Sequence, residues 1–181
     1  MSQPFEHPAH GRLWEYWQTA RAGRPALPAR EVDLSGLGRV ADFMLQVERV
    51  SGRFRYVSVG AAIQRIYGYP MEGLYLDMVL PPNRREPAIE RYTLVCNTGT
   101  PILTRNAYEI SATLSFVVDR LFVPLAGTGG TIDGALCAQI IRNSQEGALG
   151  PATRQKPAGD TLVILEPDGP DGLRAAGSTR P

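Results

Sequence analysis

The chain has 181 residues, of which 43% are hydrophobic, and 19 lysines and arginines against 18 aspartates and glutamates leave a formal net charge of +1. This length and composition predict one domain with a buried core and exclude a chain that is disordered throughout. The charge is nearly balanced and the basic residues are scattered, so we expect neither nucleic acid nor a membrane surface as a partner.

The sequence also lacks the signals of export and of membrane insertion. No basic segment followed by an apolar stretch stands near residue 1, and no run of about 18 apolar residues occurs. We therefore expect a cytoplasmic protein. Cys96 and Cys137 stand among apolar neighbours, which predicts buried, reduced thiols in place of a disulfide scaffold.

The first part of the chain predicts a flexible start and then one helix. Residues 1–10 hold two prolines and two histidines without hydrophobic periodicity, and we expect this N-terminus to be flexible. A helix is predicted over residues 13–22, because Leu13, Trp17 and Ala20 recur at helical spacing and form one apolar stripe.

A connector and a β-hairpin are expected next. Residues 24–39 contain two prolines and a GLG sequence, which predicts an extended connector. Residues 41–50 alternate apolar and polar side chains, residues 53–59 are aromatic and β-branched, and the SG between them predicts a tight turn. A short helix is predicted over residues 61–68, with Gly68 as its C-cap.

The middle of the chain predicts helices and then three strands. Residues 69–82 mix turn formers with large apolar side chains, which favours short helical turns. A longer helix is predicted between Arg85 and Asn97, with Pro87 in its first turn. The three strands are predicted over residues 102–110, 115–125 and 132–141.

The C-terminal segment has a different character. Residues 144–181 are rich in glycine and proline and contain no aromatic residue, so we expect a disordered tail after a domain that spans residues 11–143. The one apolar run of this tail, residues 161–165, has an alternative: it can add as an edge strand to a partner or to the protein's own sheet.

The order of these elements defines the expected fold class. A helix, two strands, several short helices, a longer helix and three strands form an α+β pattern. A five-stranded antiparallel sheet with helices on one face would bury the apolar stripes.

Four segments stand out, in this order: LWEYWQTARAGRPALPAR, GRFRYVSVGAAIQRIYGYPMEGLYL, LFVPL and IDGAL. Together they resemble a PAS-like family of short, mostly alphaproteobacterial, stand-alone proteins. The resemblance covers about residues 11–143. It implies a sensory or protein-interaction domain in bacterial signalling that acts through a separate, unidentified partner protein, with a small molecule as one source of input.

The resemblance also suggests a homodimer. In PAS-like proteins the first helix often packs against a second copy, which makes Leu13, Trp14 and Trp17 candidates for the dimer interface. The alternative for the two tryptophans is packing in the protein's own core.

A PAS-like fold has its ligand cavity between the sheet and the helices, and the inward residues of the predicted elements are candidates to line it. These residues are Phe43, Leu45, Tyr56, Ile63, Ile66, Tyr67, Leu76, Ile89, Tyr92, Tyr108 and Leu136. The tyrosines matter most, because a phenol combines apolar area with one hydrogen-bonding group. The alternative is a filled core without a cavity.

No cofactor is predicted. A haem-binding PAS domain supplies an axial histidine from its long helix or near it, and residues 85–97 contain none. A covalent flavin would need a cysteine in the short helices, and residues 66–80 contain none. We expect His7 and His10 to be solvated loop residues and not metal ligands.

We do not expect an enzyme, since the predicted domain contains no histidine for a catalytic triad. The alternative is a small acid/base enzyme, isomerase-like or thioesterase-like, on a cup-shaped α+β fold. Asp119 is then the residue to suspect, because it interrupts the apolar run FVVDRLFV and alternation places either Asp119 or Arg120 toward the core. The other carboxylates are expected at the surface, namely Asp77, Glu86, Glu90, Glu109 and Asp133.

Overall fold

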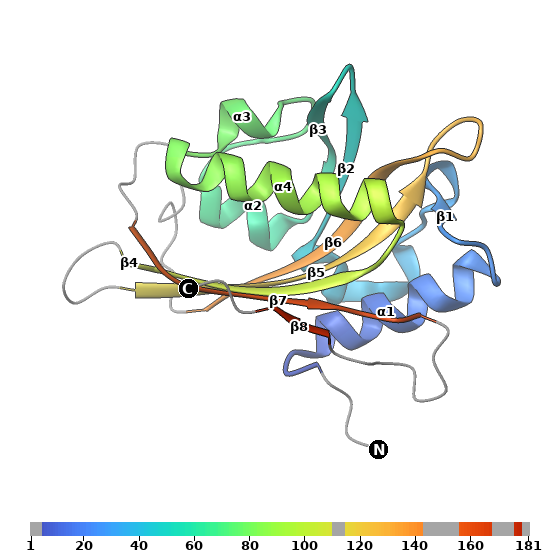
Figure 1. Ribbon diagram of the computed structural model, residues 1–181, viewed down its shortest axis with the longest axis horizontal. Coiled ribbons are helices and arrows are strands. Elements are labelled where there is room, and N and C mark those ends of the chain that lie inside the picture. Colours follow the sequence, from blue (N-terminus) through green and yellow to red (C-terminus); the bar gives the residue numbers. More distant parts are fainter. Residues whose placement is uncertain (1–4, 110–114, 143–155, 168–175, 179–181) are drawn as a thin grey trace.

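The computed structural model describes residues 5–109, 115–142, 156–167 and 176–178. An open, mainly antiparallel sheet runs through them in the order β3-β2-β6-β5-β4-β7-β8, and β1 pairs in parallel with the end of β5 (Figure 1). The strands are β1 (Leu27–Pro28), β2 (Met44–Val50), β3 (Arg53–Val59), β4 (Ile102–Glu109), β5 (Ser115–Ala126), β6 (Ile132–Arg142), β7 (Lys156–Ile164) and β8 (Ala176–Ser178).

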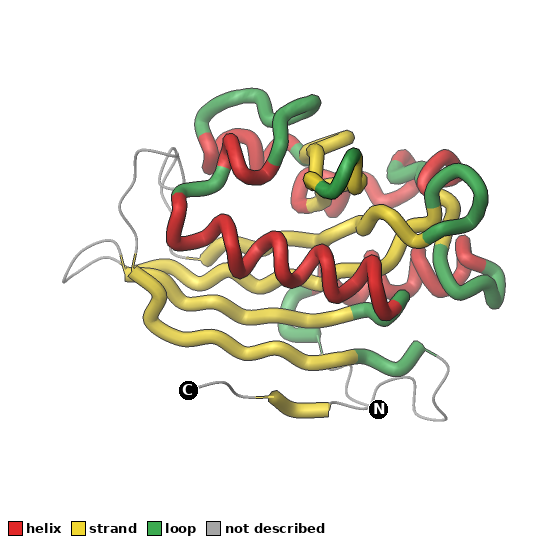
Figure 2. The backbone as a smooth tube through the Cα atoms, turned by 45° about the horizontal axis from the view of Figure 1, so that its top comes forward, coloured by secondary structure: helices red, strands yellow, loops and turns green. Residues whose placement is uncertain are grey.

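Helices cover both faces of this sheet. The first helix, α1 (Pro8–Arg21), lies on one face, and the longest helix, α4 (Pro82–Thr98), runs along the other (Figure 2). The short helices α2 (Ala61–Tyr67) and α3 (Leu76–Val79) lie on the same face as α4. None of the helices in the described part of the chain is long and apolar enough to cross a membrane.

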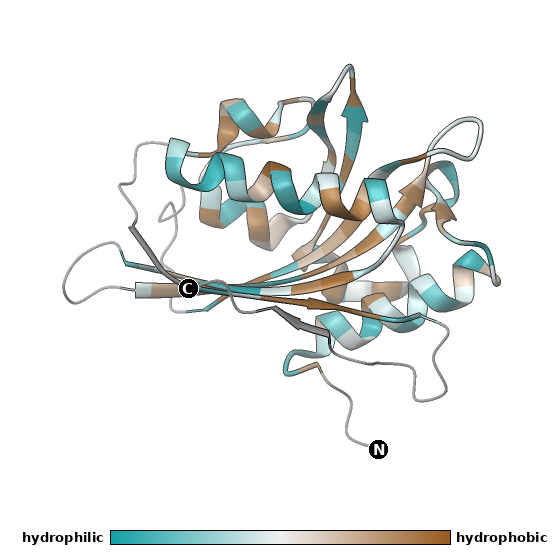
Figure 3. Cartoon of the chain, viewed as in Figure 1, coloured by the Kyte–Doolittle hydropathy of each residue, from teal (hydrophilic) through white to brown (hydrophobic). Residues whose placement is uncertain are grey.

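The two helical layers create two hydrophobic cores. Figure 3 shows apolar residues concentrated on the central strands, between the helices. Phe116, Val118 and Phe122 of β5 belong to the core beneath α2 and α4, whereas Leu121 and Val123 belong to the core beneath α1. Because successive side chains of a strand point to opposite faces, a strand covered on both sides must be apolar throughout or must satisfy its polar groups internally.

The predicted hairpin and helix ends are confirmed. Ser51 and Gly52 connect β2 and β3 with φ angles of 50° and 82°, the left-handed conformation that a two-residue hairpin turn requires. Gly68 ends α2 at φ 83°. Gly99 ends α4 at φ 66°, and a Cβ atom there would lie 2.8 Å from the side chain of Ile132. The α+β class is confirmed as well.

The predicted strand count is wrong, because Lys156–Ile164 of the expected disordered tail forms β7. This strand runs antiparallel to β4, with Ile102 opposite Ile164. Leu165 follows it with 2% of its surface exposed, and its backbone N–H donates to the Pro101 carbonyl over 3.0 Å. The composition argument treated the tail alone, whereas an existing sheet edge supplies hydrogen-bond partners for the backbone groups of a docking strand that face it. Residues 143–155, 168–175 and 179–181 lie outside the described part.

The start of the chain is also corrected. Helix α1 begins at Pro8 and not near residue 12, and His7 is its N-cap, accepting the Ala9 N–H on Nδ1 over 3.1 Å. Proline suits the first helical position because it needs no N–H acceptor there. His10 consequently lies inside the helix and is 2% exposed, in contrast to the expected solvated loop.

Three boundaries differ from expectation. The predicted extended connector contains the 3-10 helices η1 (Ala29–Glu31) and η2 (Ser35–Phe43), so that β2 starts only at Met44. Helix α4 starts at Pro82, which leaves Pro87 inside the helix and not in its first turn. The proline in the first turn of α4 is Pro82, whereas the sequence analysis gave this place to Pro87.

We predict that Leu165→Ala lowers the free energy of unfolding by about 2–3 kcal/mol, because the substitution leaves a cavity beneath the docked C-terminal segment. Hydrogen exchange along β4 should become faster in the same variant. Glu166→Ala removes an exposed neighbour and should change stability by less than about 0.5 kcal/mol. Equal effects of the two substitutions, measured by urea denaturation, would show that this segment is not docked.

Candidate functional site

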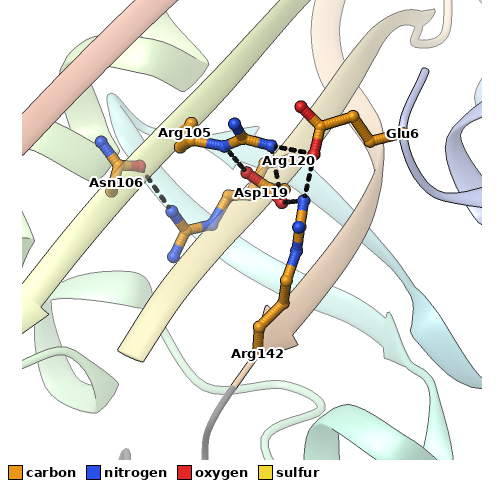
Figure 4. Close-up of polar contacts among 6 residues, drawn as sticks. All are labelled: Glu6, Arg105, Asn106, Asp119, Arg120 and Arg142. Carbon is orange, nitrogen blue, oxygen red and sulfur yellow. Dashed lines mark hydrogen bonds and ion pairs between the residues drawn. The ribbon is translucent and has the colours of Figure 1, made fainter. Parts of the chain in front are cut away.

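Two polar clusters lie on opposite faces of β5, one around Asp119 and one around Arg120 (Figure 4). The sequence predicted that one of these two neighbours points inward. The structure buries both, with 3% of Asp119 and 8% of Arg120 exposed. The reason is that β5 is a central strand with helices on each side, so that both of its faces are interior.

The cluster beneath α4 is built around the Arg120 guanidinium. Its Nε donates to the Gln139 Oε1 over 2.7 Å, and its Nη1 donates to the Asn106 Oδ1 over 2.9 Å. Thr104 of β4 and Gln139 of β6 are the direct register partners of Arg120, so all three side chains share one face of the sheet. No carboxylate of the described residues forms an ion pair with Arg120.

Helix α4 adds two more buried arginines. Arg84 donates from Nη2 to the Tyr67 hydroxyl over 2.7 Å, and its guanidinium carbon lies 5.3 Å from the centre of the Tyr108 ring. Arg91 pairs with the Asp160 carboxylate of β7, with 2.5 Å between Nη2 and Oδ2. The Arg91 side chain is 8% exposed, whereas that of Asp160 is 53% exposed.

The three guanidinium groups line one cavity between α4 and the sheet. Its volume is about 20 Å³, which is room for about one water molecule. The remaining lining residues are Leu80, Ala88, Tyr92, Tyr108 and Phe122. We call this cavity with Arg84, Arg91, Arg120, Thr104, Asn106, Gln139 and Asp160 the arginine centre.

The arginine centre carries a positive potential that reaches the neighbouring phenols. Burial alone would raise the pKa of Tyr67, but the guanidinium groups of Arg84 and Arg120 outweigh it and hold this pKa below its usual value. Tyr56 and Tyr92 are also buried, and burial raises the pKa of each well above the usual value.

The buried hydroxyl of Thr104 has no hydrogen-bond partner among the described residues. The Nε2 amide of Gln139 is also buried without a well-formed hydrogen bond to them, although its interaction with the Tyr67 hydroxyl helps to lower the pKa of that phenol. A buried polar group without a hydrogen bond costs about 1–3 kcal/mol. Such groups are rare in folded proteins and call for an explanation such as a bound water or ion.

Most of the cavity candidates from the sequence come together around the arginine centre. Buried in this core are Leu45, Tyr56, Ile63, Tyr67, Leu76, Tyr92 and Tyr108, while Ile66 and Ile89 are partly buried against it. Tyr92 and Tyr108 line the small cavity.

Phe43 and Leu136 were assigned to the wrong face and pack on the α1 side. Phe43 belongs to η2, so that the strand alternation does not extend to it. Leu136 lies in β6, where both faces are buried and the sequence shows no polar alternation that would set the register.

The sequence analysis missed the arginines. Arg84 and Arg91 are seven residues apart on the same side of α4 as Tyr92, which is the spacing of a helix stripe. Arg120 and Gln139 interrupt apolar strand segments. Charged residues at inward positions were the available signal, and it was followed only at Asp119 and Arg120.

The cluster on the α1 side joins three strands to the N-terminal segment. Asp119 accepts hydrogen bonds from Arg105, over 2.7 Å from Nε, and from Arg142. Glu6 pairs with the same two arginines, over 2.6 Å and 3.0 Å. The hydrogen bonds from Arg105 and Arg142 lower the Glu6 pKa to about 2. Asp119 is therefore neither at the surface nor in the cavity beneath α4.

His10 lies beside this cluster, at a pocket of about 190 Å³ that Asp119 and Arg142 also line. Burial lowers the His10 pKa to about 4, and the nearby Asp119 carboxylate opposes this only in part. The Nε2 atom of His10 is buried without a hydrogen-bond partner among the described residues. A neutral imidazole packed in the core is the consequence.

Two of the proposed dimer residues are core residues. Leu13 and Trp17 of α1 are fully buried against the sheet, and the Trp17 Nε1 donates to the Pro124 carbonyl over 3.0 Å. Only Trp14 is partly accessible. The cysteines are buried, and burial raises the pKa of Cys96 to about 11 and that of Cys137 to about 12, so both thiols are protonated at neutral pH.

Comparison with protein-family models and with curated proteins gave no match for this chain. The resemblance to a PAS-like family therefore stays a prediction.

We predict that the protein loses stability as the pH falls from 6.5 toward 4, and that His10 is a main cause. The unfolded chain binds a proton at the usual histidine pKa of 6.5, whereas folded His10 does so only at about 4. The stabilisation from neutral, buried His10 is thus complete above pH 6.5, and about 3 kcal/mol of it is lost by pH 4.

The measurement is urea denaturation between about pH 7 and pH 5, a range above the Glu6 transition. His10→Phe should flatten the pH dependence of the free energy of unfolding. His7→Asn retains an N-cap acceptor and should leave most of this dependence in place. An unchanged slope in His10→Phe would contradict the assignment.

Proposed function

We propose that the protein is a PAS-like sensory module that receives a small molecule between its sheet and its helices and acts through contacts with a separate protein, without catalysis of its own. The observation that carries this proposal is the arginine centre, which is buried beneath α4 and contains a hydroxyl without a hydrogen-bond partner among the described residues. A purely structural core has no need of such a centre, and apolar residues would fill it at lower cost.

The sheet supports the same proposal. Five of the strands follow the order β3-β2-β6-β5-β4, and α2, α3 and α4 are all inserted between β3 and β4. This is the arrangement that a PAS-like fold requires, with α1 and β7 as additions at one face and one edge. The helices and the sheet thereby enclose the position where such a module receives its input.

A small acid/base enzyme is the second candidate, and one observation favours it. His10 and Asp119 line the same pocket of about 190 Å³. However, Asp119 is already engaged by Arg105 and Arg142. A pKa of about 4 makes His10 a weak base at neutral pH. The groups at this pocket thus suit ion pairs that hold the strands together better than they suit proton transfer.

The test is native mass spectrometry of the protein purified from its own host, beside a denatured control. We expect a reproducible non-covalent mass that is lost on denaturation. A bare protein under every growth condition would contradict a small-molecule input and leave a module that works by protein contacts alone.

We also propose self-association through the accessible side of α1, where Trp14 contacts Phe5, with ring centroids 6.0 Å apart. Light scattering after size exclusion should give the mass of a dimer for the natural chain and of a monomer for Trp14→Lys. Met78→Lys alters a residue that is 60% exposed on α3 and should remain dimeric. A monomeric natural chain would contradict this surface.

A further inference from the structure

Arg91 and Arg120 of the arginine centre share a single carboxylate, Asp160, among the described residues. Within this part of the chain, buried Arg120 hydrogen bonds only to the neutral oxygens of Gln139 and Asn106. Arg91 is buried as well, and its pKa is lowered mainly by burial and to a smaller extent by the nearby charge of Arg120. Removing a cation from water is costly, and a nearby anion offsets this cost.

Two further donors flank the Arg120 guanidinium. Thr104 and Gln139 stand directly opposite Arg120 on the two neighbouring strands and share its face of the sheet. Each is at least nine-tenths buried. The Thr104 hydroxyl makes no hydrogen bond with any described residue, and the Gln139 Nε2 makes no well-formed one, although it interacts with the Tyr67 hydroxyl. A guanidinium between an amide and a hydroxyl donor is a suitable set of groups for an oxyanion.

One carboxylate already reaches into the centre. Asp160 is the register partner of Asn106, which binds Arg120, and Asp160 itself pairs with Arg91. Its side chain is half exposed, in contrast to the buried Arg91. Asp160 therefore stands at the boundary between the arginine centre and solvent, and among the ion pairs of the described residues its departure breaks only the one with Arg91.

We propose that the arginine centre binds a small oxyanion, a carboxylate or phosphate group, and that this group replaces the Asp160 carboxylate on Arg91. The inference rests on the proposed function and names the ligand class that such a module would sense. The cavity of about 20 Å³ has room for about one water molecule, so the departure of Asp160 supplies the additional space. The step is an exchange of one anion for another, with no bond made or broken covalently.

The competition with Asp160 gives the proposal a distinctive test. Isothermal titration calorimetry of the full chain with inorganic phosphate, and separately with acetate, is carried out at constant ionic strength set with sodium chloride. The natural chain should bind one equivalent of at least one of the two probes. Asp160→Asn should bind it about tenfold more tightly or better, since the internal competitor is gone, whereas Arg91→Gln should lose it.

A matched control separates competition from a general change of charge. Asp77 forms an exposed ion pair with Arg53 over 2.7 Å, distant in the sequence from β7. Asp77→Asn alters the net charge as Asp160→Asn does and should leave the affinity for the probe unchanged. Thermal unfolding of each variant in the absence of probe verifies that it is folded.

Three results would overturn the proposal: no binding of either probe by the natural chain and by Asp160→Asn, equal affinity of these two proteins, or undiminished binding by Arg91→Gln. Binding of acetate alone identifies a carboxylate ligand, and binding of phosphate alone identifies a phosphate ligand. A co-purified ligand without an acidic group would refute the oxyanion while leaving the sensory function intact, so that the two failures can be told apart.

Discussion

The burial of β5 on both faces is the constraint that organises this protein. Asp119 and Arg120 are neighbours on that strand, and alternation sends one charge into each hydrophobic layer. Each charge lies in its own polar network. Asp119 forms ion pairs with Arg105 and Arg142, which also bind Glu6 just before α1, whereas Arg120 donates hydrogen bonds to uncharged amides. The position of the N-terminal helix and the chemistry of the inner cavity both follow from this pair.

The two networks differ in the way that matters for function. Around Asp119 the carboxylates and guanidinium groups are matched, and three strands and the N-terminal segment are joined together. Around Arg120 the partners are neutral, and the Thr104 hydroxyl has no hydrogen-bond partner among the described residues. In the same part of the chain, the half-exposed Asp160 on β7 is the one carboxylate that pairs with Arg91. The network around Asp119 stabilises the fold, whereas the network around Arg120 has the groups of an anion-binding site.

Local patterns predicted the local structure well. The hairpin, the helix end at Gly68 and the three strands after α4 follow from alternation and turn residues that act over a few positions. The strand β7 depends on a partner edge far away in the sequence, which composition does not reveal. Arg84, Arg91 and Arg120 interrupt apolar patterns, which indicates inward side chains, but their convergence on one centre depends on strand pairing that the sequence does not show. Leu136 was misplaced because β6 is buried on both faces.

The central claim is that Arg120 serves ligand binding and does not stabilise the fold. The most direct measurement is the free energy of unfolding of Arg120→Met/Gln139→Met/Asn106→Leu, which replaces Arg120 and both of its hydrogen-bond acceptors by apolar side chains. The account predicts a stability equal to that of the natural chain or higher, since a buried charge without an anion is costly and apolar packing is not. A loss of about 3 kcal/mol or more would contradict it and would identify Arg120 as a structural residue.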